Sequence, residues 1–137
     1  MRSRRTGGLA VLMALLACAA TAIGQDAVEE LSVPDMAFGT GYDYQTRSLE
    51  GEGTTFAAGA QAIWCRTRIV GATEPTTVTH VWYRDGKTMA RVQLAVTSPS
   101  YRTVSSKTML PDWTGRWEVK VLDDAGTILR SESFTVE

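Results

Sequence analysis

Apolar and polar residues alternate along most of the chain beyond residue 35. Within residues 61–70, for example, Ile63, Cys65, Thr67 and Ile69 alternate with larger or charged side chains. A period of two is typical of a β-strand with one buried face. The prolines and most glycines fall between such runs, as expected for turns. The pattern predicts an all-β fold with seven strands, at residues 36–43, 61–70, 77–84, 88–96, 102–109, 116–123 and 128–136.

Two turns support this arrangement. Asp85 and Gly86 separate two of the predicted strands, and both residue types tolerate the positive φ that a two-residue hairpin turn requires. Residues 123–126 form another turn before the last strand. Its two carboxylates, Asp123 and Asp124, lack the further oxygen ligands of a calcium site. Seven short strands with such turns predict an antiparallel β-sandwich of the immunoglobulin-like type.

Alternation also assigns core positions. Cys65 shares a face with two isoleucines, and Trp117 alternates with Val119 and Val121, so we expect these side chains to be buried. The segment 48–60 is expected to join the first two strands as a loop that Phe56 anchors to the sandwich.

The strand at residues 77–84 permits two orientations. If Trp82 points inward, it resembles the buried tryptophan of immunoglobulin-like sandwiches, and His80 becomes a hydrogen-bonded core residue. We favour this orientation. In the other, His80 and Trp82 lie on the surface beside Arg102 or Lys107.

The first residues predict export. Three arginines precede the uncharged apolar run from Leu9 to Ala22, which is short for a membrane span and typical of a secretory signal. We expect cleavage after Ala22 or Gly24, and therefore a periplasmic or extracellular protein. The predicted layout is a signal peptide at 1–24, an acidic leader at 25–35 and a single domain at 36–137.

A lipoprotein signal is the alternative, because Leu15, Leu16 and Ala17 precede Cys18. Lipidation of Cys18 would anchor the protein to a membrane. Against it, Leu16 is larger than the residue usually found two positions before the modified cysteine. In either case Cys65 has no intrachain partner, so we predict no disulfide.

The charge distribution narrows the class of partner. Removing the signal removes three arginines and no acids, which leaves 11 basic and 15 acidic residues. A net charge of −4 argues against a nucleic-acid partner. Residues 25–56 contain seven acids and a single arginine, whereas the remainder contains ten basic and eight acidic residues. Either the acidic segment is simply solvated or it folds over a basic face.

Several motifs resemble one bacterial family. The sequence contains Thr-His-Val-Trp-Tyr at 79–83, Tyr-Arg-Thr-Val-Ser-Ser-Lys at 101–107, Trp-Thr-Gly-Arg-Trp at 113–117 and Phe-Thr-Val at 134–136. An acidic, glycine-containing stretch followed by Thr-Thr-Phe precedes them. In this order the motifs resemble the bacterial domain of unknown function numbered twenty-nine-fourteen, over roughly residues 36–137. The resemblance implies a domain extent and an architecture but no activity.

The candidate chemistry favours binding over catalysis. The single histidine, His80, and the absence of a His or Cys cluster predict neither a metal site nor a cofactor. Arg102 offers a planar guanidinium fork near hydroxyls and an ammonium, a combination suited to an anion or a sugar. Trp113 lies in a loop, where it caps the core or is exposed. The candidate binding residues are His80, Trp82, Arg102, Ser105, Ser106, Lys107 and Trp113.

We therefore predict a noncatalytic binding or interaction module at the bacterial envelope, with a glycan or a protein as partner. One alternative is a small hydrolase or lyase that uses His80, although Ser105 and Ser106 lie inside a predicted strand rather than on an exposed elbow. The other alternative is a structural spacer or assembly domain.

Overall fold

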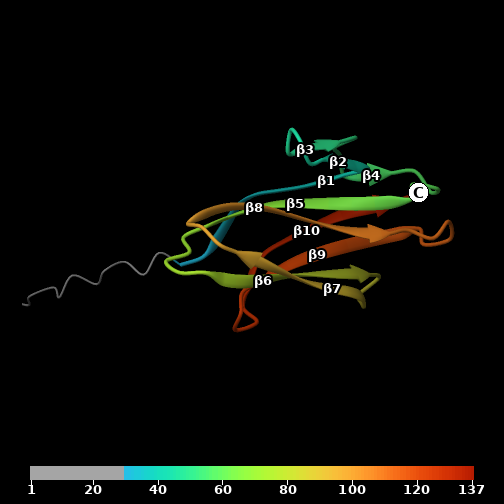
Figure 1. Ribbon diagram of the computed structural model, residues 1–137. Coiled ribbons are helices and arrows are strands. Elements are labelled where there is room, and N and C mark those ends of the chain that lie inside the picture. The colour runs from blue at the N-terminus through green and yellow to red at the C-terminus, as the bar shows by residue number, and fades with distance from the viewer. Residues whose placement is uncertain (1–29) are drawn as a thin grey trace, which may run out of the picture.

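The computed structural model describes residues 30–137, and this part of the chain is all-β (Figure 1). It contains no helix among these residues, as the alternation predicts. The predicted signal peptide, Cys18 and the first part of the acidic leader lie outside the described residues. The strands are β1 (Ser32–Gly39), β2 (Gly41–Asp43), β3 (Ser48–Glu50), β4 (Thr55–Phe56), β5 (Ala62–Val70), β6 (Thr76–Arg84), β7 (Lys87–Val96), β8 (Ser100–Thr108), β9 (Gly115–Leu122) and β10 (Ile128–Val136).

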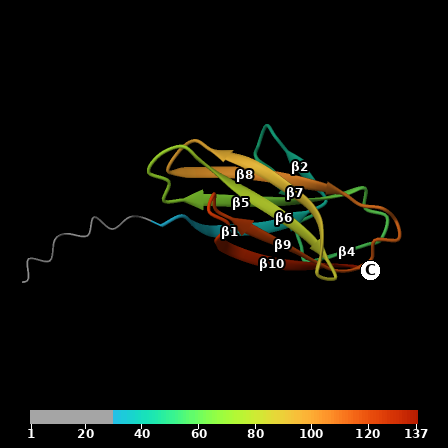
Figure 2. The same cartoon turned by 90° about the horizontal axis from the view of Figure 1, so that it is seen from below.

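Two main sheets enclose a common core (Figures 1 and 2). One has three strands in the order β1-β5-β8, and the other has five in the order β4-β10-β9-β6-β7. Their pairings are antiparallel except for the short parallel contact between β4 and β10. A separate hairpin of β2 and β3 lies above β1 in Figure 1.

The core is built from the alternating faces that the sequence predicts. Ile63, Cys65, Thr67 and Ile69 of β5 are completely buried. Facing them from the five-stranded sheet are aromatic and β-branched side chains, which form a continuous cluster. Its fully buried members on β6 and β9 are Val78, Trp82, Trp117, Val119 and Val121. Phe56, buried on β4, contacts Phe134 at a ring-centroid distance of 5.8 Å and anchors its segment as predicted.

Strand β6 is buried on both faces at its centre. Trp82 points into the core, yet Val81, on the opposite face, is also fully buried. The register places Val81 between Arg91 of β7 and Lys120 of β9. Long basic side chains cover apolar surface with their methylene stems, which accounts for a burial that alternation alone does not predict.

The N-terminal half differs from the prediction. The expected strand at 36–43 is two strands, β1 and β2, and β1 already begins at Ser32, inside the predicted leader. Pro34 and the register shift between Ser32 and Asp35 obscure the alternation here, and an edge strand accommodates such a proline. The expected loop at 48–60 contains β3 and β4, whose two or three residues are too short to show a period. Residues 30–137 thus contain ten strands rather than seven.

The predicted turns are present. Asp85 and Gly86 have φ values of 48° and 79°, as expected for a tight hairpin between β6 and β7. Asp123 accepts hydrogen bonds at Oδ1 from the amides of Ala125 (3.0 Å) and Thr127 (2.8 Å), so its carboxylate stabilises the turn before β10.

Candidate functional site

The seven predicted binding residues do not form one site. The structure separates them among the interior, one end of the molecule and the outer face of the three-stranded sheet. His80, Trp82 and Ser105 are buried, with exposed fractions of 0%, 0% and 5%. These three side chains therefore do not contribute to an exposed binding face, although they were candidate binding residues. For His80 and Trp82 this is the inward orientation that we favoured from the sequence, with His80 as a hydrogen-bonded core residue.

The buried residues form a hydrogen-bonded bridge between the two sheets, which we call the inter-sheet bridge. His80 Nδ1 lies 2.6 Å from Ser105 Oγ, and His80 Nε2 lies 3.0 Å from Thr67 Oγ1. Trp82 Nε1 donates to the same Ser105 oxygen at 3.2 Å. A consistent set of donors has the Ser105 hydroxyl donating to Nδ1 and a protonated Nε2 donating to Thr67, which makes the imidazole neutral.

Ser105 and His80 are the residue types of a catalytic nucleophile and its general base, but a substrate could not reach them. Both residues are buried, and the imidazole nitrogen remote from Ser105 contacts a threonine hydroxyl rather than a carboxylate. Burial lowers the pKa of His80 to about 4, because an apolar environment disfavours the imidazolium. The bridge thus holds a neutral histidine in the core.

Protonation of His80 should destabilise the fold. The folded-state pKa lies below the ordinary value of 6.5, so the unfolded chain takes up the proton first as the pH falls. The stability that neutral His80 contributes is complete above about pH 6.5 and is lost as the pH falls toward 4. We expect a decrease of about 3 kcal/mol in the free energy of unfolding across this window, measured by urea denaturation.

The matched control is His80→Gln, which has no titrating group at this position. Carboxylates titrate at low pH in both proteins, so only the difference between their pH profiles reports His80. Parallel profiles between pH 6.5 and 4.5 would contradict this assignment.

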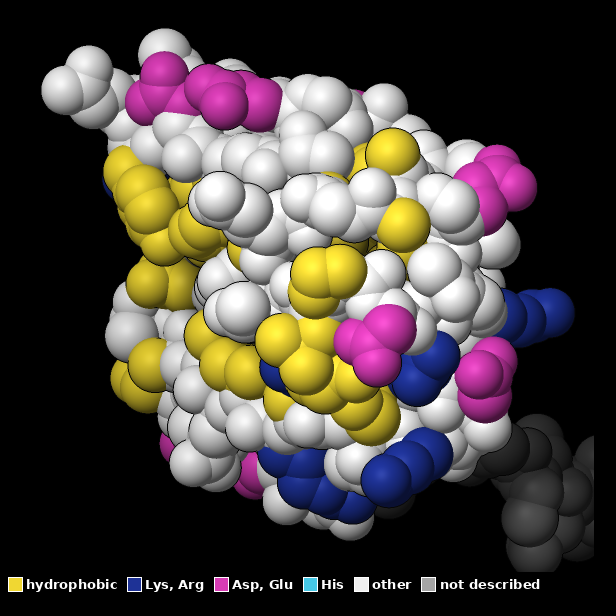
Figure 3. Space-filling view, turned by 90° about the vertical axis from the view of Figure 1, so that its right-hand side faces the viewer, with side chains coloured by type: hydrophobic (Ala, Val, Ile, Leu, Met, Phe, Trp, Pro, Cys, Tyr) yellow, Lys and Arg dark blue, Asp and Glu magenta, His cyan; other side chains and the backbone are white. Residues whose placement is uncertain are grey.

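Lys107 and Trp113 lie at the end of the molecule that carries the C-terminus. The Lys107 ammonium lies 4.8 Å from the centre of the Trp113 ring, which packs against the core at 6.1 Å from Trp117. Arg84 fixes the loop by donating to the carbonyls of Asp112 and Thr114. Figure 3 shows apolar side chains gathered on this end, with basic side chains beside them. Trp113 thus closes the end of the core.

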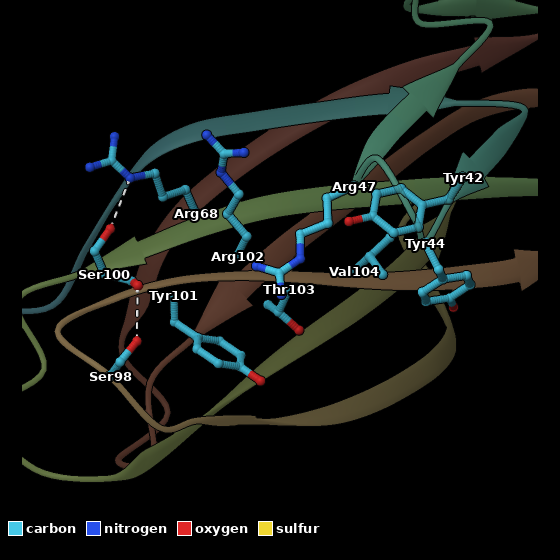
Figure 4. A pocket seen from close by; sticks show the side chains of 10 residues that line it. All are labelled: Tyr42, Tyr44, Arg47, Arg68, Ser98, Ser100, Tyr101, Arg102, Thr103 and Val104. Atoms are coloured by element: carbon cyan, nitrogen blue, oxygen red, sulfur yellow. Dashed lines mark hydrogen bonds between the residues drawn. The ribbon is translucent and has the colours of Figure 1, made fainter.

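Arg102 belongs to a different region, a hollow along the edge strand β8 (Figure 4). We call it the arginine hollow. Its volume is about 940 Å³. Three guanidinium groups contribute to it from separate elements: Arg68 from β5, Arg102 from β8 and Arg47 from the turn between β2 and β3. The described residues that line it are Tyr42, Tyr44, Arg47, Arg68, Ser98, Ser100, Tyr101, Arg102, Thr103 and Val104.

The strand register brings two of these cations together. Arg68 and Arg102 are directly opposite in the antiparallel pair of β5 and β8, and Figure 4 shows both projecting from the same side of the strands. Arg68 Nε donates to Ser100 Oγ at 3.1 Å. Arg47, held at a positive φ of 56°, extends from its turn toward β8 (Figure 4).

Among residues 30–137, no carboxylate lines the arginine hollow. The nearest acid in the register, Asp35, is opposite Arg68 but forms its ion pair with Arg66 at 3.1 Å. In the described part of the chain, the ion pairs involve Arg66, Lys120 and Arg130 and none of the hollow's arginines. The hollow therefore concentrates positive charge without an internal counterion among these residues.

Ser106 lies near the hollow but does not line it. It is exposed on the same outer face of β8, opposite Trp64 of β5. Sequence reasoning identified Arg102 and missed Arg47, Arg68 and the three tyrosines. The signals available were the outward positions of Arg66 and Arg68 on their strand and the spacing of Tyr42 and Tyr44.

Comparison with protein families supplies one match. Residues 75–136 match the family DUF2914, a protein of unknown function. The match confirms the predicted resemblance to this family, over a shorter range than the 36–137 expected. No curated protein matches the chain significantly.

The DUF2914 match begins beside β6 and ends with β10. It contains Arg102 and the other hollow residues of β8 and the preceding turn, whereas Arg47 and Arg68 precede it. The hollow therefore combines residues inside and outside the DUF2914 match. Within residues 30–137, no His, Cys, Asp and Glu side chains are grouped as metal ligands. The same residues include no helix long and apolar enough to cross a membrane.

Proposed function

We propose that this protein is a noncatalytic binding module of the cell envelope and that it binds a multiply charged anion in the arginine hollow. One observation carries the proposal: Arg68 is paired across the sheet with Arg102, and none of the described residues that line the hollow they share is a carboxylate. Like charges directly opposite on a sheet are destabilising. A violation of a local rule without a compensating contact is typical of functional sites.

On the same face of the sheet, the neighbouring Arg66 forms the ion pair expected of a structural arginine. Arg66 is paired with Asp35 by hydrogen bonds from Nε and Nη2. A ligand with two or more negative charges would give Arg68 and Arg102 an equivalent partner, and guanidinium forks form paired hydrogen bonds with carboxylates and phosphates. Binding to the folded state would then also stabilise the protein.

The rest of the lining suits a polar ligand. Ser98, Ser100, Tyr101 and Thr103 add hydroxyl groups that donate and accept hydrogen bonds. A hollow of about 940 Å³ is at the upper end of the volume range of small-molecule sites, so it accommodates a ligand larger than a single inorganic ion.

The test measures binding of two chemically different polyanions, oligogalacturonate and polyphosphate, by isothermal titration calorimetry. Arg68→Ala and Arg102→Ala should each weaken binding about tenfold, because each removes a charge-assisted hydrogen bond. Added NaCl should weaken binding further.

The control is Arg91→Ala, which removes the same charge from exposed β7. It should leave the affinity unchanged, since Arg91 lies outside the hollow. Equal weakening by all three substitutions would indicate nonspecific attraction, and no binding by either polyanion would refute the proposal.

A hydrolase or lyase that uses His80 is the second candidate, favoured by the 2.6 Å contact between His80 and Ser105. It ranks lower because both side chains are buried and Ser105 also accepts a hydrogen bond from Trp82. A hydrolytic activity toward esters or amides that disappears in Ser105→Ala, with the fold intact by circular dichroism, would favour it over binding. We expect the wild-type chain to show no such activity.

We also propose export, with an immunoglobulin-like arrangement of the domain. The basic start and the apolar run to Ala22 support export, and the two sheets around the buried Trp82 support the arrangement. Expression in a Gram-negative host should yield a mature chain that begins at Ile23 or Gln25, measured by intact-mass spectrometry. A lipid-modified Cys18 would instead place the hollow at a membrane surface and contradict soluble export.

A further inference from the structure

We propose that the anion is an acidic oligosaccharide, whose carboxylates bind in the arginine hollow while its sugar rings lie on an adjoining aromatic platform. The platform consists of Tyr42, Tyr44 and Trp64. This inference rests on the proposed function of the hollow and adds the class of ligand. The supporting observation is that the two surfaces are continuous: Tyr42 and Tyr44 line the hollow and also form part of the platform.

The platform is a packed aromatic cluster with one open member. Tyr42 stacks on Trp64 of β5 at a centroid distance of 6.0 Å and an interplanar angle of 20°. Tyr44 meets both rings edge-on, at 5.0 Å from Tyr42 and 6.0 Å from Trp64. Tyr44 nevertheless remains 68% exposed, so its ring is held by neighbours and still presents apolar surface to a ligand.

The β2–β3 hairpin fixes the platform relative to the arginines. Asp43 Oδ1 accepts hydrogen bonds from the amides of Gln45 (2.8 Å) and Thr46 (3.3 Å), which closes the turn that carries Tyr44 and Arg47. A Cβ at Gly39 would lie 2.5 Å from the carbonyl oxygen of Glu50. Only glycine therefore permits the hairpin to fold back this closely. Arg47, Tyr42 and Tyr44 are thus all held in place by this one hairpin.

The combination of groups favours an acidic sugar over other anions. A sugar ring has apolar C–H faces, which an aromatic ring can cover, and hydroxyls, which the Ser, Thr and Tyr hydroxyls of the hollow can bind. A polyphosphate has no apolar face, so it would use the arginines and the hydroxyl donors of the hollow but not the faces of the aromatic rings. A single-stranded nucleic acid could also stack its bases on tyrosines, so it is included as a competing ligand in the experiment.

The experiment compares ligands on the full chain by calorimetry: oligogalacturonate, its neutral methyl ester, polyphosphate of matched charge and oligothymidylate. We expect oligogalacturonate to bind most tightly and its ester to bind poorly. Tyr44→Ala should weaken binding of oligogalacturonate about threefold to tenfold, the range expected for loss of an aromatic contact, without affecting polyphosphate. Tyr44→Phe should retain binding, because it keeps the ring.

The outcomes separate this inference from the proposed function. If Arg102→Ala weakens both polyanions but Tyr44→Ala weakens neither, the hollow binds anions and the sugar assignment is wrong. Tighter binding of oligothymidylate, or of polyphosphate, overturns the sugar assignment in the same way. If Arg68→Ala and Arg102→Ala have no effect on any ligand, the function of the hollow and the sugar assignment both fail. Melting curves of each variant verify that these surface substitutions leave the fold intact.

Discussion

The contact on which the rest of the structure depends is the inter-sheet bridge at His80. An imidazole buried between two sheets has two polar nitrogens, and each needs a partner because an unpaired buried polar atom costs about 1–3 kcal/mol. Thr67 and Ser105, from two strands of the opposite sheet, supply both partners. The hydrophobic effect is non-directional, whereas these hydrogen bonds require the donors and acceptors of the two sheets to be aligned.

This alignment is linked to the position of Arg102 on the outer face of β8. Ser105 points inward to the bridge, and its partner in the register of β5 is Cys65. The same register makes Arg102 the partner of Arg68. Because side-chain direction alternates along a strand, a shift of one residue would move Arg102 to the core side and Ser105 to the solvent. The bridge therefore selects the register that brings the two arginines together.

This dependence explains how much of the molecule could be predicted from the sequence. The facing of Cys65 follows from local alternation, and the hairpin at Asp85 follows from the conformations its residues tolerate. The proximity of Arg68 to Arg102 cannot be predicted in this way, because it depends on pairing between β5 and β8, which are separated in sequence by two other strands. Nor can the position of Arg47, since β2 and β3 are too short to carry a period. Ser105 was placed correctly in a strand, but the sequence around it did not indicate which residues of that strand face the core.

The two faces of the β5–β8 pair differ in whether their polar and charged groups have partners. In the described residues, every buried side-chain polar atom has a hydrogen-bond partner, and the outward Arg66 has its carboxylate. Arg68, two residues further along the same face, and its partner Arg102 form no ion pair with a carboxylate of the described residues. Their repulsion is tolerable because each guanidinium extends into solvent, where a high dielectric weakens it. Desolvation by a ligand would strengthen that repulsion unless the ligand carried negative charge. If the hollow binds a ligand as proposed, the two cations that are tolerated unpaired in water would discriminate against neutral occupants, and this selectivity would follow from the register that pairs Arg68 with Arg102.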